Sequence, residues 1–203
     1  MLISNEKRVI RPRKTYPTKS RTYRKPHHKE GYETKSKLIE LKARVDTLDD
    51  AREKMAVMGA RKQGTYHQRD TYFNTPKGRL KLREVEGESI SKLVYYERED
   101  AQKPKTSDVI ILETEDPETL NAILEMILGT KVTVNKRREI YQHEGTQIHL
   151  DEVDGLGTFI EFERKIQDLK KDRRVLEGLM ERLEIKKESL IRGSYSDLKL
   201  GNV

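Results

Sequence analysis

Apolar and charged residues alternate along much of this chain. In the run Leu38–Val45, Ile39 and Leu41 alternate with Glu40, Lys42 and Arg44. Side chains of a β-strand point alternately to its two faces, so this pattern predicts a strand with one apolar and one ionised face. Turn residues such as Gly, Pro and Asp bound seven further runs of this kind, at 65–74, 78–86, 90–100, 107–115, 131–142, 146–153 and 157–166.

Three segments have helical spacing instead. The first follows Thr47, a predicted N-cap, and ends at Gly59, and the second has Asp116 as N-cap and Pro117 in its first turn. The third, 168–185, carries an apolar stripe at helical spacing. Eight strands linked mostly by hairpins, with three helices, predict an α+β fold in which an antiparallel sheet or closed barrel has helices packed outside.

Composition and charge divide the chain of 203 residues into two parts. Residues 1–37 hold twelve Lys or Arg and three Glu, a charge of +9, so the net charge of +7 leaves −2 for residues 38–203. We predict a disordered basic tail at 1–37 and a folded domain at 38–203. The tail either contacts RNA or another polyanion or is a solubilising leader.

Several classes of protein are excluded or disfavoured by composition. The chain has no cysteine, which excludes disulfides and thiolate metal sites, so any metal must be held by oxygen or histidine ligands. It has no apolar run long enough to span a membrane and no apolar signal-peptide core, and we expect a cytoplasmic location.

The ionised strand faces are the candidate site. They are made of Glu40, Lys42, Arg44, Arg79, Lys81, Arg83, His149, Asp151, Glu161, Glu163 and Lys165. Such a face can lie in water, as on many antiparallel sheets. Alternatively, the sheet closes and the charges line a tunnel, which requires a polyanion and metal ions to compensate them.

If the charges line a tunnel, their types suit a triphosphate and a divalent metal ion. A triphosphate needs several basic side chains from different strands, with Arg giving bidentate contacts to phosphate oxygens. Glu161 and Glu163 place two carboxylates about 7 Å apart along one strand face, which suits Mg²⁺ or Mn²⁺.

Six blocks of sequence resemble, in order, those of the CYTH domain. They are IELKARVDTLDDAREKMAVMGA, QRDTYFNTPKGRLKLRE, LVYYERED, VNKRREIY, IHLDEVDGLGTFIEFE and GSYSDLKL. This superfamily includes class IV adenylyl cyclases, thiamine triphosphatases and other triphosphate tunnel metalloenzymes. The resemblance implies an eight-stranded antiparallel β-barrel that forms a tunnel, a divalent metal and a triphosphate substrate, and it is compatible with a homodimer.

The resemblance also implies residue roles. Catalysis falls to Glu40, Lys42, Glu161 and Glu163, and metal binding to Glu40, Asp151, Glu161 and Glu163. Phosphate binding falls to Lys42, Arg44, Lys81, Arg83, Arg98, Lys136 and Arg138. Two positions depart from the family pattern: Leu38 replaces the first Glu of its opening E-x-E-x-K motif, and Tyr96 replaces a Lys of the fourth strand. Arg98 is the candidate substitute for that Lys.

Three functions remain open from the sequence. The first is metal-dependent hydrolysis of a phosphate from ATP, thiamine triphosphate or inorganic triphosphate. The second is cyclisation of ATP to cyclic AMP. The third is binding of a triphosphate, polyphosphate or RNA 5′ end without turnover, which Leu38 favours.

Overall fold

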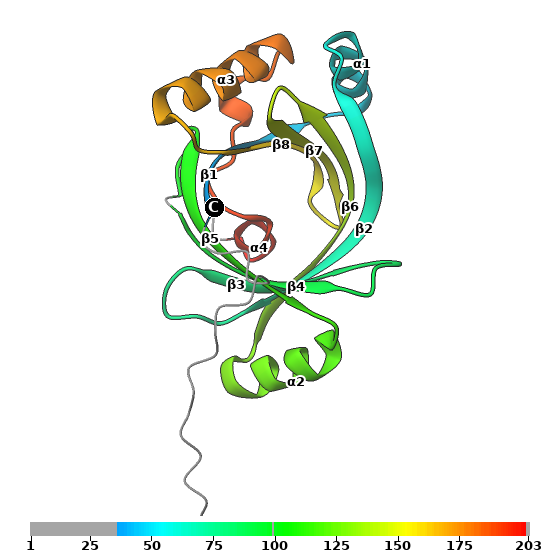
Figure 1. Cartoon of the computed structure of the whole chain (residues 1–203), viewed down its shortest axis with the longest axis vertical. Coiled ribbons are helices and arrows are strands. Elements are labelled where there is room, and N and C mark those ends of the chain that lie inside the picture. The colour runs from blue at the N-terminus through cyan, green and yellow to red at the C-terminus, as the bar shows by residue number, and fades with distance from the viewer. Residues whose placement is uncertain (1–35, 99, 202–203) are drawn as a thin grey trace, which may run out of the picture. The chain divides into compact units, whose positions relative to one another are not determined.

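Eight antiparallel strands form a closed barrel in the computed structural model, which describes residues 36–98 and 100–201. Around the ring the order is β1-β5-β4-β3-β2-β6-β7-β8 (Figure 1). The strands are β1 (Ser36–Val45), β2 (Arg61–Phe73), β3 (Arg79–Val85), β4 (Ser91–Arg98), β5 (Lys105–Thr114), β6 (Thr130–His143), β7 (Thr146–Val153) and β8 (Gly157–Lys165). All eight predicted strands are confirmed, and β1 begins two residues before the predicted domain boundary.

In the described residues, four α-helices accompany the barrel, together with the short 3₁₀ helix η1 (Lys187–Ser189). They are α1 (Asp49–Val57), α2 (Pro117–Leu128), α3 (Leu169–Arg182) and α4 (Tyr195–Lys199). For α2 the predicted cap is confirmed, because the Asp116 side chain accepts a hydrogen bond from the Thr119 N–H at 3.0 Å. The cap predicted for α1 is wrong by one residue: Leu48 occupies the N-cap, and Thr47 Oγ1 accepts from the Asp49 N–H.

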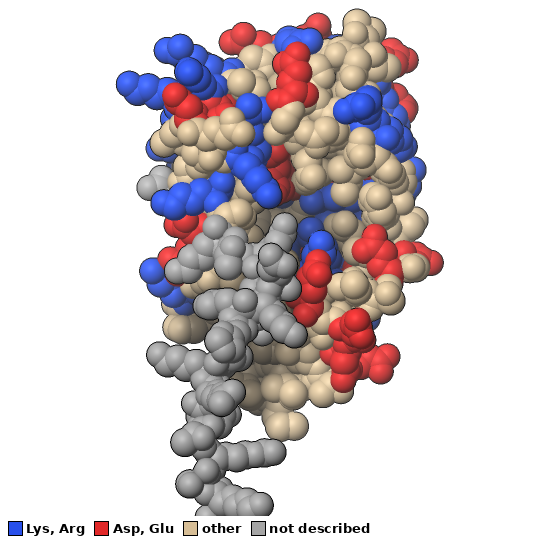
Figure 2. Space-filling view, viewed as in Figure 1, with Lys and Arg blue, Asp and Glu red and all other residues tan. Residues whose placement is uncertain are grey.

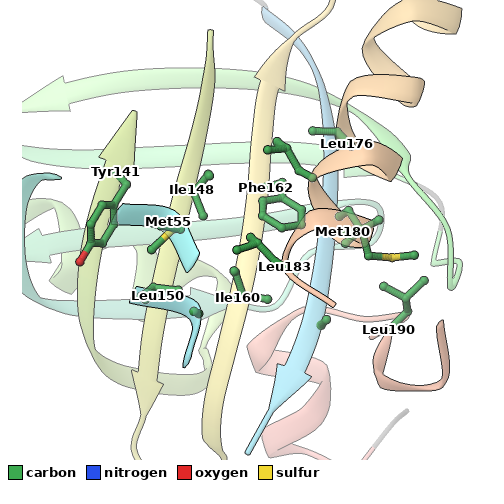
Figure 3. Packing of buried hydrophobic residues seen from close by; sticks show 14 of the residues in the cluster. Met55, Tyr141, Ile148, Leu150, Ile160, Phe162, Leu176, Met180, Leu183 and Leu190 are labelled. Carbon is green, nitrogen blue, oxygen red and sulfur yellow. The ribbon is translucent and has the colours of Figure 1, made fainter. Parts of the chain in front are cut away.

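The main hydrophobic core lies outside the barrel. The apolar faces of β1, β6, β7 and β8 pack against α1 and α3 (Figure 3). Met55 of α1 and Leu176 of α3 are fully buried there, together with Phe162 of β8. Burying this face stabilises the closed sheet by the hydrophobic effect and leaves the ionised faces of the same strands pointing inward.

The inward direction of the charges settles the choice between a water-facing sheet and a tunnel. Glu40, Lys42, Arg83, Arg138 and Glu161 all line the barrel interior, as the tunnel alternative predicted.

One end of the interior is filled rather than open. Tyr195 of α4 packs with Phe159, the two ring centroids lying 5.0 Å apart, and with Tyr72, Val134 and Val153. In the view along the barrel, α4 lies within the ring of strands (Figure 1). This helix was not predicted as an element from the sequence. A capping box between Ser194 and Asp197 fixes its start.

Two surface properties bear on partners. Within residues 36–98 and 100–201, no helix is both long and apolar enough to cross a membrane. On the face shown in Figure 2, basic and acidic side chains are interspersed over the barrel. The predicted basic tail falls outside the described residues, apart from Ser36 and Lys37, which belong to β1.

Candidate active site

A cavity of about 550 Å³ occupies the barrel interior and is lined by residues of all eight strands and of the Ser194–Tyr195 segment. It collects eight of the predicted site residues, Glu40, Lys42, Lys81, Arg83, Arg98, Arg138, Glu161 and Glu163. A second hollow, of about 720 Å³, contains only Lys136 of the predicted set. Most of the predicted site residues therefore lie in the barrel cavity. Its lining has seven Lys or Arg and five Asp or Glu.

Asp70 is the centre of the first charge cluster. Its carboxylate lies 3.0 Å from Lys81 Nζ, 2.7 Å from Arg83 Nε and 2.6 Å from Lys136 Nζ. Burial alone would raise the pKa of Asp70, but Arg83, Lys136 and Lys81 hold it well below its usual value.

The three cations of this cluster share a single carboxylate and are not fully compensated. Burial, together with the nearby Arg83, lowers the pKa of Lys81 to about 8. Burial likewise holds the pKa of Lys136 well below its usual value, despite its contact with Asp70. The cluster therefore has an excess of positive charge, which suits a polyanion.

Sequence reasoning missed Asp70. Alternation on β2 does place Gln68, Asp70 and Tyr72 on one strand face. The importance of Asp70 follows only from its contact with Lys136 of β6, and the sequence does not predict that pairing.

A second cluster joins Lys42, Arg138, Asp151 and Glu161. Lys42 Nζ lies 3.0 Å from Glu161 Oε1, and Arg138 Nη2 donates to Glu161 Oε2 at 2.8 Å. Burial would raise the pKa of Glu161, but Lys42, His149 and Arg138 hold it well below its usual value. Glu161 is therefore ionised, and it orients two basic side chains towards the cavity.

Asp151 is occupied by protein donors. Arg138 Nε and Nη2 donate to its two carboxylate oxygens at 2.6 Å and 2.5 Å, and the Tyr195 hydroxyl donates at 2.6 Å. The side chain is fully buried and does not line the cavity. In this arrangement Asp151 positions Arg138; the predicted role of Asp151 in metal binding stays a prediction.

Arg44 and His149 lie at the margins of this cluster. Arg44 stacks over the Phe159 ring, donates to the Leu156 carbonyl at 2.5 Å and does not line the cavity. His149 Nδ1 lies 3.4 Å from Glu161 Oε2, and its Nε2 lies 3.3 Å from Gln147 Oε1. Both ring nitrogens of His149 thus have a polar neighbour within the barrel.

Glu40 and Glu163 suit a divalent cation. They are register partners on β1 and β8 and both line the cavity. Directly opposed carboxylates repel unless a cation lies between them. Arg98 Nη1 contacts Glu40 Oε1 and Ser107 Oγ donates to Glu40 Oε2 at 3.3 Å, whereas Glu163 forms no ion pair within the described residues.

These carboxylates form only part of a coordination shell. In the part of the chain that the structure describes, no three His, Asp or Glu side chains gather closely enough to complete a metal site alone. One or two carboxylates completed by phosphate oxygens and water is the arrangement usual for Mg²⁺. The residues present therefore fit a metal that binds together with a phosphate ligand.

Arg98 is buried beside this pair. Its Nε and Nη2 have no hydrogen-bond partner among the described residues, and burial lowers its pKa. Buried guanidinium nitrogens without acceptors are costly, and a phosphate oxygen would satisfy them. Arg98 lies two residues from Tyr96 on β4 and contacts Glu40; its role as a substitute for the family Lys stays a prediction.

Comparisons with known proteins agree with this architecture. The family model of the CYTH domain matches residues 36–195. The Methanocaldococcus jannaschii protein named "Putative adenylate cyclase MJ0240" is 31% identical over 173 residues, which cover 79% of this chain and 97% of that protein.

Solved structures share the fold. The PH1012 protein from Pyrococcus horikoshii OT3 superposes with a TM-score of 0.74 at 26% identity, covering 79% of this chain and 98% of that one. The Hippeastrum protein HpAC1, described as a "putative adenylyl cyclase" with a dominant triphosphatase activity, has a TM-score of 0.58 at 17% identity, covering 82% and 97% of the two chains. The closed barrel, its inward charges and the match over residues 36–195 together establish that this chain belongs to the CYTH domain family.

Proposed function

We propose that this protein is a metal-dependent triphosphatase that hydrolyses a phosphate from a triphosphate bound in the barrel cavity. The observation that carries the proposal is the convergence of Lys42, Lys81, Arg83, Arg98 and Arg138 from four different strands on one cavity. A triphosphate concentrates several negative charges over a short length, and such a cavity matches it in sign and extent.

The side chains have distinct roles in this proposal. The Asp70 cluster and the Glu161 cluster hold their cations in fixed positions, so the phosphate-binding geometry exists before substrate arrives. Donors fixed in advance stabilise the charge that develops on phosphate oxygens during transfer, without reorganisation at the moment of reaction. Arg98 supplies two further donors beside Glu40.

Glu40 and Glu163 are the residues that would hold the metal, Mg²⁺ or Mn²⁺, together with phosphate oxygens and water. When bound, the metal would neutralise charge on the phosphates and polarise the bond to be cleaved. Glu40 and Glu163 would reach it from opposed strands. Glu161, whose oxygens contact Lys42 and Arg138, lies two residues from Glu163 on the same face of β8.

The first experiment measures phosphate and pyrophosphate release from ATP, thiamine triphosphate and inorganic triphosphate with Mg²⁺ or Mn²⁺. We expect metal-dependent release of phosphate that is lost in Glu161→Gln/Glu163→Gln. Glu152→Gln is the control, because this exposed residue lies on the same sheet, points outward and should leave turnover unchanged. Release that is independent of metal, or unaffected by the double substitution, would overturn the proposal.

Cyclisation of ATP is the second candidate, and the 31% identity to a protein named as an adenylate cyclase favours it. The two reactions differ in product: hydrolysis of the terminal phosphate yields phosphate, whereas cyclisation yields pyrophosphate and cyclic AMP in equal amounts. The ratio of the two products from ATP therefore decides between them.

Binding without turnover is the third candidate. It predicts tight triphosphate binding by calorimetry with no product from any substrate. Deleting residues 1–35, which leaves β1 intact, tests the tail: a cavity enzyme keeps its turnover of small triphosphates, whereas a tail-driven RNA binder loses affinity and its steep salt dependence.

A further inference from the structure

The cavity is not charged on all sides. Leu38 of β1, Val94 of β4 and Val109 and Ile111 of β5 line it next to one another, and we call these four residues the apolar wall. Val109 is the register partner of Tyr96, and Ile111 is the partner of Val94, so the apolar positions are contiguous on the sheet. Leu38, Val94 and Val109 are only 8 to 9% exposed.

The apolar wall adjoins the phosphate-binding cations. Leu38 precedes Glu40 and Lys42 on the same strand face, at separations of about 7 and 13 Å along the strand. On the other side, Val94 is the register partner of Lys81, and Lys81 Nζ lies 5.8 Å from the centroid of Tyr96. A group covalently attached to a triphosphate held by Lys42 and Lys81 would therefore reach the wall.

An apolar wall contributes nothing to binding an inorganic phosphate chain. Phosphate oxygens seek donors and cations, and contact with Leu or Val side chains only removes their water. An organic group gains affinity on the same surface, because both partners bury apolar area. The volume of about 550 Å³ is also in the range of sites that take organic small molecules.

We propose that the cavity selects organic triphosphates whose organic group presents an apolar or aromatic face, such as a nucleoside triphosphate, over inorganic triphosphate. This inference rests on the proposed function, since it assigns the substrate class of the same site. The basic side chains, with a bound metal, would hold the triphosphate, and the apolar wall would hold the organic group.

The test uses ATP, thiamine triphosphate and inorganic triphosphate as probes of the full-length protein. We expect kcat/KM to be at least about tenfold higher for one of the organic triphosphates than for inorganic triphosphate. Val109→Thr and Val94→Thr, which keep side-chain size but add a hydroxyl, should lower kcat/KM for that organic probe about tenfold. Both should leave inorganic triphosphate within about twofold, which also verifies that the variants are folded.

Ile110→Thr is the matched control. Ile110 is the chain neighbour of Val109, points away from the cavity and is 41% exposed. This substitution should change the kinetics of no probe.

The outcomes separate the inference from the function on which it rests. Equal or better use of inorganic triphosphate, or a parallel loss for all probes in Val109→Thr and Val94→Thr, overturns the inference and leaves the triphosphatase proposal standing. If the wild-type protein neither cleaves nor binds any of the three probes, measured by calorimetry with Mg²⁺, both proposals fail.

Discussion

Lys136 Nζ lies 2.6 Å from Asp70 Oδ2 in the barrel interior, and neither side chain is more than 1% exposed. The same carboxylate also serves Lys81 and Arg83. Asp70 is therefore the residue that permits three cations to be held together in the absence of ligand.

Asp70→Asn should destabilise the protein strongly. The substitution leaves three buried cations without their shared carboxylate, and removing one partner of a buried pair costs about 3–5 kcal/mol. Inorganic triphosphate should raise the melting temperature of Asp70→Asn more than that of the wild type, because the ligand replaces the missing charge. Asp108→Asn, on the exposed face of β5, is the control and should melt like the wild type. An unchanged melting temperature for Asp70→Asn would contradict the role of Asp70 in holding the three cations together.

Glu163→Gln tests whether Glu163 binds the metal rather than the phosphates. Without metal, the variant should be as stable as the wild type or up to about 1 kcal/mol more stable, because it relieves repulsion with the opposed Glu40. With Mg²⁺ or Mn²⁺ and inorganic triphosphate, its thermal stabilisation by metal should require at least about tenfold more of the ion. A metal response equal to that of the wild type would exclude Glu163 as a ligand.

Triphosphate affinity should fall as the pH rises above about 8. The free protein loses the proton of Lys81 there, because burial lowers its pKa to about 8, whereas a bound triphosphate favours the charged lysine and raises that pKa. Binding near pH 9 should therefore take up a proton, which calorimetry in buffers of different ionisation enthalpy measures directly. ATP is the probe to use, because its terminal phosphate loses its last proton at a pH of about 6, as a phosphate ester does, and is already ionised in this range.

Lys81→Arg is the matched variant for this pH effect. Arginine keeps its charge across the range, so the proton uptake assigned to Lys81 should disappear while affinity at pH 7 is retained. Equal proton uptake by both proteins would assign the effect to another group.

Tyr195→Phe should cost about 1–2 kcal/mol of the free energy of unfolding. It removes the hydroxyl that donates to Asp151 at 2.6 Å but keeps the ring that Lys42 Nζ approaches at 3.5 Å. Urea denaturation should show a lower midpoint with an unchanged m-value. Tyr66→Phe is the control, because the Tyr66 hydroxyl makes no hydrogen bond with the described residues, and a similar loss there would contradict the role of the Asp151 contact.

The local elements could be predicted from sequence because their signals are local. Strand alternation identified β1 and β7 within two residues, and Asp116 with Pro117 marked the start of α2. Alternation also separated the inward charges from the outer core, since burial of one face fixes the register of each strand.

The features that were missed depend on long-range pairing or very short elements. β2 pairs with β6 and β1 pairs with β5, and neither pair is a hairpin. No turn sequence between them therefore predicts that they are neighbours. Within the Asp70 cluster, the contact with Lys136 crosses the β2–β6 pair, and in the apolar wall Leu38 joins the other three residues across the β1–β5 pair. With only five residues, α4 is too short for helical periodicity, and its capping box is visible only in retrospect.

Closure of the ring also constrains how the protein reaches its working state. β1 pairs with both β5 and β8, and its partner β8 lies more than a hundred residues further along the chain. Such non-local contacts slow folding, because loop-closure entropy is lost before the contacts form. Lys42 and Glu161 lie on β1 and β8, so they come into contact only when these two strands pair and close the ring. A nascent chain thus lacks the proposed triphosphate site until β8 has been synthesised, and a triphosphate bound there would stabilise the closed ring.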